Sequence, residues 1–415
     1  MDSVSYRMYI TGVPETRASL FDTDLSDPHH FTEGPPLEIL AALREHDPVH
    51  FNPIGFAGEA FWSITRWDDV NACSKDSATF SSTGGSTIPG TAIFGDMQRM
   101  MMVSQDPPQH TQRRALLQKV FTPRVVAAQE ESITAVINDL VDQVVIPGCC
   151  DLVADVTRPF PLLVIADMLG VPREDQAKLL TWSDAITSLQ GTDDATGALA
   201  TAVDEMGEYL ASFIASRRAE PRDDLISRLI RTEVDGVGLN DVELLVSFAE
   251  MMVAGNETTR STLAGAILLL IQHPDQLAEL RARPDLMGNA VEEVLRYWTP
   301  NVYQARTVTR DVVVSGRELK QGERIAMWLC SANRDPSKHY DPDSFDIHRQ
   351  ETQHMSFGGG GRHHCLGAAL ARLELTIGLQ VLLGRLDDLE LDGLPVVTPH
   401  TFLHALHSLP VRFKA

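Results

Sequence analysis

A long helical segment near the middle of the chain limits what the rest of the fold can be. Asn240 and Glu243 form a capping box, and a helical pattern then runs from Asp241 to His273, where Pro274 ends it. At 1.5 Å per residue this helix is roughly 50 Å long, enough to cross an entire domain. It is apolar on nearly every side, so most of it must be buried and the other elements must pack around it.

The centre of this helix is polar, with the sequence AGNETTR. Gly255 leaves room beside the backbone, and the Thr258 hydroxyl can donate to the Ala254 carbonyl one turn back and bend the helix locally. These features predict a groove with the Glu257 carboxyl beside it. A plainer interpretation stays open, in which Glu257 pairs with Arg260 three residues later and the polar turn only borders the core.

Charge and targeting signals narrow the function classes. Lys and Arg total 35 and Asp and Glu total 57, a formal net charge of −22, which disfavours binding to nucleic acids or anionic membranes. Residues 1–20 lack the basic start and apolar run of a signal peptide, and the longest apolar stretch, 263–271, is far shorter than the roughly 20 residues that span a bilayer. Five cysteines without a CxxC pair indicate a reducing compartment. We therefore expect a cytoplasmic protein with no membrane anchor, acting on a small neutral substrate or on a basic partner.

Periodicity divides the chain into a helical part and a part with strands. Helical patterns predominate from Ile133 to His273 and, more broadly, over about 107–300. No linker or repeat separates domains, so residues 1–415 are predicted to form a single, mainly α domain with small β-sheets in about 301–350 and 387–415. Strands are expected at 311–314, 323–329, 396–397 and 409–413, and long loops at 80–95, a candidate mobile lid, and at 191–197.

A glycine run leads into a cysteine and then a helix. The segment 357–367 reads FGGGGRHHCLG, and an amphipathic pattern follows from residue 368. Cys365 thus lies at a helix N-terminus, where free N–H groups and the helix dipole favour a thiolate. The glycines let the backbone approach a flat, bulky group. A metal-bound thiolate is the natural interpretation.

Three other interpretations of this segment carry less weight. A phosphate-binding loop would need a following Lys-Ser/Thr pair or, for a dinucleotide, a glycine where His363 stands. Zinc fits poorly because His363, His364 and Cys365 are adjacent and can hardly converge on one ion. A structural cysteine in a glycine turn stays open from this segment alone.

The cysteine loop and the central helix are accompanied by Glu293 and Arg296, an ExxR motif, in the order and near the separations of a known family. The chain resembles a cytochrome P450 of the soluble bacterial type over nearly its whole length. The resemblance implies haem b between the central helix and the haem loop, 357–367, with Cys365 as the iron ligand. It also implies that Glu293 and Arg296 form a structural ion pair, completed by a residue of 341–349.

The resemblance further implies the catalytic and haem-binding residues. Thr258 and Glu257 match the alcohol and acid that deliver protons for oxygen activation. His110 and Arg114, one helical turn apart and so on one face, match contacts of a haem propionate. Phe357 stands eight residues before the cysteine instead of the usual seven, which leaves its ring position open. The cofactor-binding residues implied are His110, Arg114, Ala254, Gly255, Arg306, Phe357, Gly361, His363, Cys365 and Gly367.

The activity implied is that of a haem-thiolate monooxygenase, which inserts one atom of O₂ into an apolar lipid, steroid or terpenoid-like molecule. By the family's layout, substrate specificity comes from 80–102, the helices flanking 191–197, 301–304 and the turn at Phe402. Two alternatives remain: a peroxide-driven haem-thiolate enzyme, which would not need the acid and alcohol, and a non-catalytic haem-binding sensor or carrier.

The resemblance also implies redox partners. NAD(P)H would supply electrons through a ferredoxin reductase and an acidic ferredoxin, and the protein is expected to be a monomer. Residues 107–129 contain no Asp or Glu. Arg113, Lys119 and Arg124 in this segment are therefore predicted to dock the ferredoxin.

Overall fold

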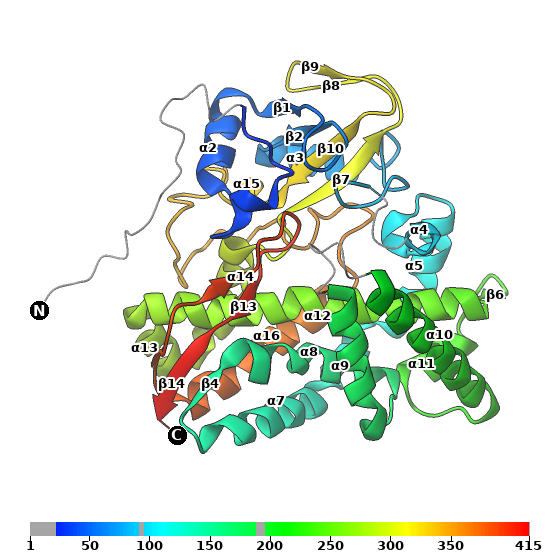
Figure 1. The fold of residues 1–415 in the computed structure, drawn as a ribbon, viewed down its shortest axis with the longest axis vertical. Helices are drawn as coiled ribbons and strands as arrows, with labels where there is room; N and C mark the ends of the chain where they lie inside the picture. The colour runs from blue at the N-terminus through cyan, green and yellow to red at the C-terminus, as the bar shows by residue number, and fades with distance from the viewer. Residues whose placement is uncertain (1–21, 91–94, 188–195, 415) are drawn as a thin grey trace, which may run out of the picture.

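The computed structural model describes residues 22–90, 95–187 and 196–414, and helix α12, Asp241–Gln272, runs across its centre (Figure 1). The Asn240 side chain accepts a hydrogen bond from the Glu243 N–H, and the Glu243 carboxylate accepts one from the Asn240 N–H. Every residue from Ser261 to Leu270 is buried. The predicted capping box, extent and burial of this helix are confirmed.

The other helices pack around α12 to form a mainly α fold. Helix α8 packs against α12 from one side, and α14 and α16 also contact it. Gly265 allows the Trp298 indole of α14 to lie against α12, because a Cβ at Gly265 would collide with the ring. The α-helices are α2 Leu37–His46, α3 Trp67–Lys75, α4 Gly95–Met100, α5 Gln109–Val120, α6 Pro123–Ala127, α7 Glu130–Val145, α8 Pro159–Leu169, α9 Arg173–Thr187, α10 Thr196–Ala219, α11 Leu225–Arg231, α13 Pro274–Ala282, α14 Met287–Trp298, α15 Leu329–Ala332 and α16 Ala368–Arg385. Short helical turns are η1 Pro28–Phe31, η2 Met102–Ser104, the π-turn η3 Val153–Thr157 and η4 Pro284–Leu286.

The largest sheet lies on the other side of α12 from α7 (Figure 1). Its strand order is β1-β2-β10-β7-β3, with β2 and β10 parallel and the other pairs antiparallel. A second sheet, β11-β14-β4, and three two-stranded pairs complete the strands. The strands are β1 Val49–Asn52, β2 Phe61–Ile64, β3 Phe80–Ser81, β4 Cys149–Asp151, β5 Glu233–Val234, β6 Val237–Gly238, β7 Tyr303–Val308, β8 Val312–Val314, β9 Arg317–Leu319, β10 Arg324–Trp328, β11 Asp387–Leu391, β12 Val396–Val397, β13 Leu406–Ser408 and β14 Pro410–Lys414.

Every segment predicted to be a strand contains one, in β8, β10, β12 and β14. The prediction missed β1, β2 and β3, which lie before residue 107, and β4, β5 and β6 inside the helical part. These strands have two to four residues, too few to establish an alternating pattern. Two of them are held by distant partners, since β2 pairs with β10 and β4 with β14.

The first predicted loop is tied down over its described part. The Ile88 N–H donates to the Tyr303 hydroxyl at 2.9 Å, and the Ser86 carbonyl accepts from the Ala305 N–H at 2.8 Å. Arg324 donates to the carbonyls of Gly85 and Thr87. Hydrogen bonds thus hold residues 85–88 of this loop, its role as a lid stays a prediction, and 91–94 lie outside the described residues. Of the second loop, 191–195 also lie outside them.

The part of the chain that the structure describes contains no helix with both the length and the apolar character to cross a membrane.

Candidate active site

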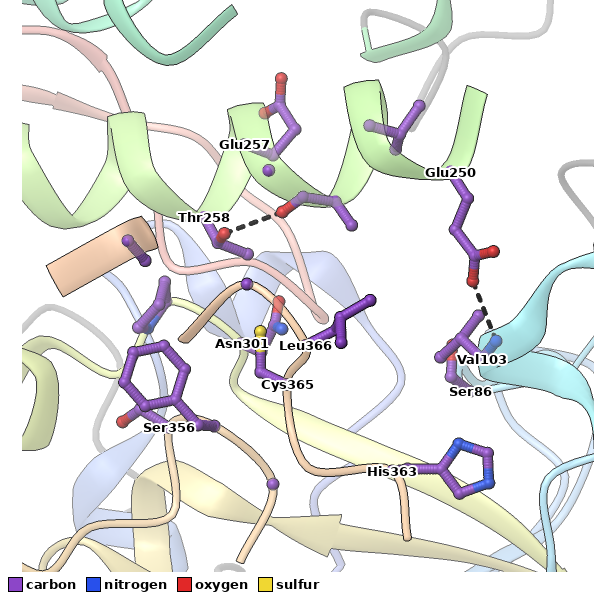
Figure 2. Close-up of a pocket in the computed structure, with 18 of the residues that line it drawn as sticks. Ser86, Val103, Glu250, Glu257, Thr258, Asn301, Ser356, His363, Cys365 and Leu366 are labelled. Atoms are coloured by element: carbon purple, nitrogen blue, oxygen red, sulfur yellow. Dashed lines mark hydrogen bonds between the residues drawn. The ribbon is translucent and has the colours of Figure 1, made fainter. Parts of the chain in front are cut away.

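A cavity of about 420 Å³ separates α12 from the haem loop, 357–367 (Figure 2). Thr258 of α12 and Cys365 of the loop lie on facing sides of it. Its lining is mostly apolar, with residues from η2, α5, α8, α12, β7 and α16. Of the twelve site residues predicted, the following eleven line this cavity: His110, Arg114, Ala254, Gly255, Glu257, Thr258, Arg306, Phe357, His363, Cys365 and Gly367.

Gly361 does not line the cavity and has a different part in the fold. A Cβ at this position would collide with the backbone carbonyl of Ser74, at the end of α3. Gly361 therefore lets the loop pack directly on α3. The sequence could not show this contact, because it joins segments almost three hundred residues apart.

Cys365 lines the cavity with part of its surface exposed, while its sulfur is surrounded by protein atoms. Its N–H donates to the Phe357 carbonyl at 2.9 Å, and α16 begins three residues later. Burial raises the pKa of the Cys365 thiol, while the Gly367 N–H and the charges of Arg114 and Arg372 act in the opposite direction. Binding of a metal cation at this sulfur would favour the thiolate form.

The glycines of the haem loop accommodate the extra residue between Phe357 and Cys365. Gly358, Gly359 and Gly360 all have positive φ angles, a conformation that side chains disfavour. The Phe357 ring is buried at the cavity, with the Arg372 guanidinium 4.5 Å from its centre. Phe357 thus reaches the cavity despite its unusual spacing.

The polar centre of α12 presents an alcohol to the cavity. The Thr258 hydroxyl donates to the Ala254 carbonyl at 2.9 Å, as predicted, and the Thr262 hydroxyl donates to the Thr258 carbonyl at 2.7 Å. Gly255 lets α8 approach, because a Cβ there would lie 2.6 Å from Ile165 Cδ1. The room that Gly255 leaves is thus taken on one side by Ile165.

Glu257 has a partner in the structure. Its carboxylate forms an ion pair with Arg260 at 2.5 Å, the pairing that the plainer interpretation of the sequence described. Figure 2 shows its side chain rising from α12 on the side away from Cys365. Both interpretations of this segment therefore hold: Thr258 lines the cavity, and Glu257 is paired with Arg260 on the other side of α12.

A cluster of basic side chains closes one end of the cavity. The His110 and His363 rings lie 4.1 Å apart, and His363 Nε2 is 3.0 Å from the Ser82 hydroxyl. The Arg114 guanidinium donates to the His364 carbonyl at 2.7 Å, and Arg306 donates to the carbonyl of the residue before it.

The electrostatics of this cluster are those of an anion site. Burial lowers the pKa of Arg306 to about 10, that of His110 to about 4 and that of His363 to about 3. Within the described residues, neither Arg114 nor Arg306 has a carboxylate at ion-pair distance, and neither ring nitrogen of His110 has a hydrogen-bond partner. Arg306 is thus a buried cation and Arg114 a half-buried one, and cations without a carboxylate partner favour an anionic group in the cavity.

The ExxR motif forms a buried triad away from the cavity centre. Arg296 donates to both Glu293 carboxylate oxygens at 2.7 and 2.8 Å, and Arg349 donates to one of them at 3.0 Å. Arg296 also binds the carbonyls of Asn333, Pro342 and Ser344. Arg349 is thus the third member that was expected from 341–349.

The comparisons with known proteins decide the family. The model of the family described as "Cytochrome P450" matches residues 54–409. The chain is a cytochrome P450. It is 35% identical over 396 residues to the methyl-branched lipid omega-hydroxylase of Mycobacterium tuberculosis, covering 90% of each chain. It is 37% identical to a steroid C26-monooxygenase of Mycolicibacterium smegmatis, covering 94% of this chain and 96% of that one.

Solved structures agree with this assignment. Cytochrome P450 CYP109Q5 from Chondromyces apiculatus has a TM-score of 0.87 and 35% identity, covering 95% of this chain and 99% of that one. CYP109E1 from Bacillus megaterium, solved with testosterone, has a TM-score of 0.83 and 32% identity, covering 92% and 99%. The P450 is therefore an oxidoreductase that uses haem and O₂.

The residues present fit haem. A cysteine sulfur, the soft ligand by which P450 haem is held, faces an apolar cavity. The unpaired cations at the cavity end match the two propionate carboxylates of haem. Zinc lacks a ligand set, because no cluster of three or more His, Cys, Asp or Glu side chains exists in the described ranges.

Sequence reasoning missed two acids of the P450 cavity, Glu250 and Glu374. Glu250, on α12, accepts hydrogen bonds from the N–H groups of Met102 and Val103. Glu374, on α16, is 2% exposed, and burial raises its pKa well above the usual value. Both side chains lie in apolar helical patterns, where only the tertiary neighbours show what the carboxyl contacts.

We expect Glu374→Gln to make stability less dependent on pH. Since the folded-state pKa of Glu374 is raised, the stability that its neutral form provides is present in acid and is lost as pH rises through that pKa. The variant should match the wild type near pH 4 and exceed it by about 1–3 kcal/mol at pH 8. Urea unfolding of the variant and the wild type at both pH values measures this difference in stability. An equal difference at pH 4 and pH 8 would contradict the prediction.

The structure corrects the predicted role of Arg113. This side chain is 5% exposed, and its guanidinium donates to the Met100 and Glu243 carbonyls and to the Ser247 hydroxyl. It cannot meet a protein partner at the surface. The residues next to Arg113 on α5 alternate between buried and exposed positions. The sequence alone therefore does not show whether the Arg113 side chain faces the core or the solvent.

Proposed function

We propose that this cytochrome P450 hydroxylates a neutral lipid or steroid in the cavity above Cys365, which is the proximal ligand of its haem. The observation that carries the proposal is an apolar cavity in which Cys365 faces Thr258. The described cavity lining contains three cationic side chains. Arg114 and Arg306 belong to the anion site, and Arg260 is paired with Glu257. No cation is left for a carboxylate on the substrate, which favours a neutral molecule.

Relatives support the same substrate class. A methyl-branched lipid omega-hydroxylase and a steroid C26-monooxygenase act on the compounds that their names print, and CYP109E1 was solved with testosterone. All of these are large and apolar, as the cavity requires.

A titration followed by the haem absorption spectrum tests the proposal. The holoprotein is titrated with a steroid, a methyl-branched fatty acid and the methyl ester of the same acid. We expect the steroid and the ester to shift the band, and the ester to bind at least about tenfold more tightly than the acid, because burying an unpaired carboxylate is costly. Tighter binding of the free acid, or no shift with any of them, would overturn the proposal.

When bound, haem supplies the activation of O₂, and electron density from the Cys365 thiolate favours O–O cleavage. The residues of this chain bind, orient and move protons. His110, Arg114, Arg306 and His363, which line the cavity, would hold the haem propionates. The Thr258 hydroxyl, on the cavity side of α12, donates a proton at the reacting centre, and Glu257 restores it through water after leaving Arg260.

This relay predicts that Thr258→Ala binds substrate normally but diverts reducing equivalents into peroxide. Glu257→Gln should slow turnover by roughly 10²–10⁴-fold, the usual contribution of a general acid–base group. Thr258→Ser keeps a hydroxyl and serves as the matched control. Product formed per reduced cofactor consumed is the measurement. Wild-type coupling in both Thr258→Ala and Glu257→Gln would sink the relay and favour the peroxide-driven alternative.

We infer that NAD(P)H reduces this P450 in the cytoplasm through a ferredoxin reductase and a ferredoxin, which docks on the thiolate side. Lys119 and Arg124 are exposed, on α5 and next to it in α6, and α6 packs against α16. Arg362, exposed within the haem loop itself, takes the place first given to Arg113. These three cations form a patch for an acidic partner around the Cys365 loop.

The patch predicts that Lys119→Glu, Arg124→Glu and Arg362→Glu each slow reduction by ferredoxin several-fold at low salt. The dependence of the rate on ionic strength should also flatten. Lys320→Glu, the same charge change beyond the end of β9, is the control. Stopped-flow reduction across a salt series decides it, and rates equal to wild type at low salt would rule the patch out.

A further inference from the structure

We propose that Glu250 is a specificity-determining positioning residue, whose carboxylate holds Met102 and Val103 as the cavity wall that limits the size and the site of oxidation of the substrate. The proposal deepens the function proposed above and rests on it. It assigns a role to a partly buried acid that the proton relay does not use.

The Glu250 carboxyl group accepts hydrogen bonds from backbone N–H groups of the wall. Oε2 accepts from the Met102 N–H at 3.0 Å and Oε1 from the Val103 N–H at 2.9 Å, the second contact being drawn in Figure 2. Glu250 is the acceptor that the described residues provide for these two N–H groups. Two hydrogen bonds from neighbouring N–H groups to one carboxyl group fix the turn η2 to α12.

Arg113 supports this contact by joining the end of α4 to α12. Its guanidinium joins three elements, because it donates to the Met100 carbonyl at the end of α4 and to Glu243 and Ser247 on α12, at 3.1 and 2.9 Å. The charge of Arg113 also opposes the rise that burial causes in the Glu250 pKa. The acid and the base thus clamp the segment from α4 to η2 against the first half of α12.

The clamp lies on the stripe of α12 that faces the cavity. Ser247, Glu250, Ala254 and Thr258 follow one another at helical spacing, and all four line the cavity. Glu250 therefore stands about 12 Å along the helix axis from Thr258, at the distance of a substrate rather than of the reacting atoms. It positions a wall and is not a catalytic residue.

The wall itself is apolar. Met101, Met102 and Val103 line the cavity, and Met101 is almost fully buried. Side chains of this kind touch a lipid or steroid without offering it a hydrogen bond, so their position can select by shape alone. A wall fixed by two hydrogen bonds leaves less space for a bulky ligand than a loosened one.

Glu250→Gln tests the clamp without a large change of volume. The amide offers one acceptor oxygen and turns its NH₂ towards the other N–H, so one hydrogen bond is lost. We expect amide exchange in a peptide spanning 98–105 of the holoprotein to rise roughly tenfold, the size of one lost hydrogen bond. Arg113→Lys, which keeps the charge but loses the guanidinium fork, should act in the same direction to a smaller extent.

The functional readout is selectivity. The ratio of dissociation constants for a steroid and a slender linear alcohol, measured from the haem band, should move by about tenfold in favour of the steroid, and oxidation should spread over more positions. Glu279→Gln, the same change on α13, is the matched control and should change neither quantity.

The outcomes are distinguishable. Faster exchange with unchanged selectivity, or unchanged exchange in Glu250→Gln, would overturn the proposal. A wild-type holoprotein that no lipid, alcohol or steroid shifts would contradict the proposed function instead, and the exchange rates would then decide whether Glu250 holds the wall.

Discussion

Cys365→Ser is expected to lose the strongly red-shifted absorption band that the CO complex of thiolate-bound haem gives, together with all monooxygenase activity. A serine oxygen is a poor replacement for a soft sulfur donor. Cys365 is the one cysteine of the five that lines the cavity. The haem can still be held by the propionate site, so the variant should bind haem with an altered spectrum.

Cys149→Ser is the matched control for this variant, because Cys149 is exposed on β4, in a sheet apart from the haem loop. The buried Cys73 and Cys330 provide two more controls. CO difference spectra of the four variants are the measurement. A Cys365→Ser protein that kept the band would show that another residue ligates the iron.

Arg296→Leu is expected to cost about 3–5 kcal/mol of stability, enough to leave little folded holoprotein. The Arg296 and Glu293 side chains are each 1% exposed, and removing the guanidinium leaves a buried carboxylate that keeps only Arg349 and the Asp346 N–H as partners in the described residues. It also removes the side-chain donor from the carbonyls of Asn333 and Pro342, in the chain that leads to the haem loop.

Arg412→Leu is the control, since Arg412 pairs with Glu390 where both side chains are about 60% exposed. Such surface pairs contribute about 0–1 kcal/mol. Urea unfolding midpoints and haem content of the two purified variants decide the prediction. Equal losses in both would mean that the triad does not hold the fold.

Local chemistry explains what the sequence predicted well. A capping box and a Thr hydroxyl bonded one turn back need only neighbours within four residues, so α12 and Thr258 were found. The Glu293–Arg296 pair is local in the same way. The family resemblance supplied the distant members, His110 and Arg306.

Long-range packing explains what the sequence could not predict. Arg113 lies on the side of α5 that faces α4 and α12, so it clamps these helices and is not a surface charge. The sequence of α5 alone does not show which side faces inward. Gly361 serves the contact with Ser74, which a glycine run cannot reveal. The wall bound by Glu250 depends on a contact across more than one hundred residues.

The central claim is that this cytochrome P450 inserts one atom of O₂ into an apolar molecule, and labelled oxygen tests it most directly. Holoprotein, NADPH, a ferredoxin and its reductase are incubated under ¹⁸O₂ with the steroid or ester that shifts the haem band most strongly. The account predicts a hydroxylated product carrying one ¹⁸O atom, the second atom appearing in water. A product whose oxygen comes from water, or an equal yield without O₂, would contradict it.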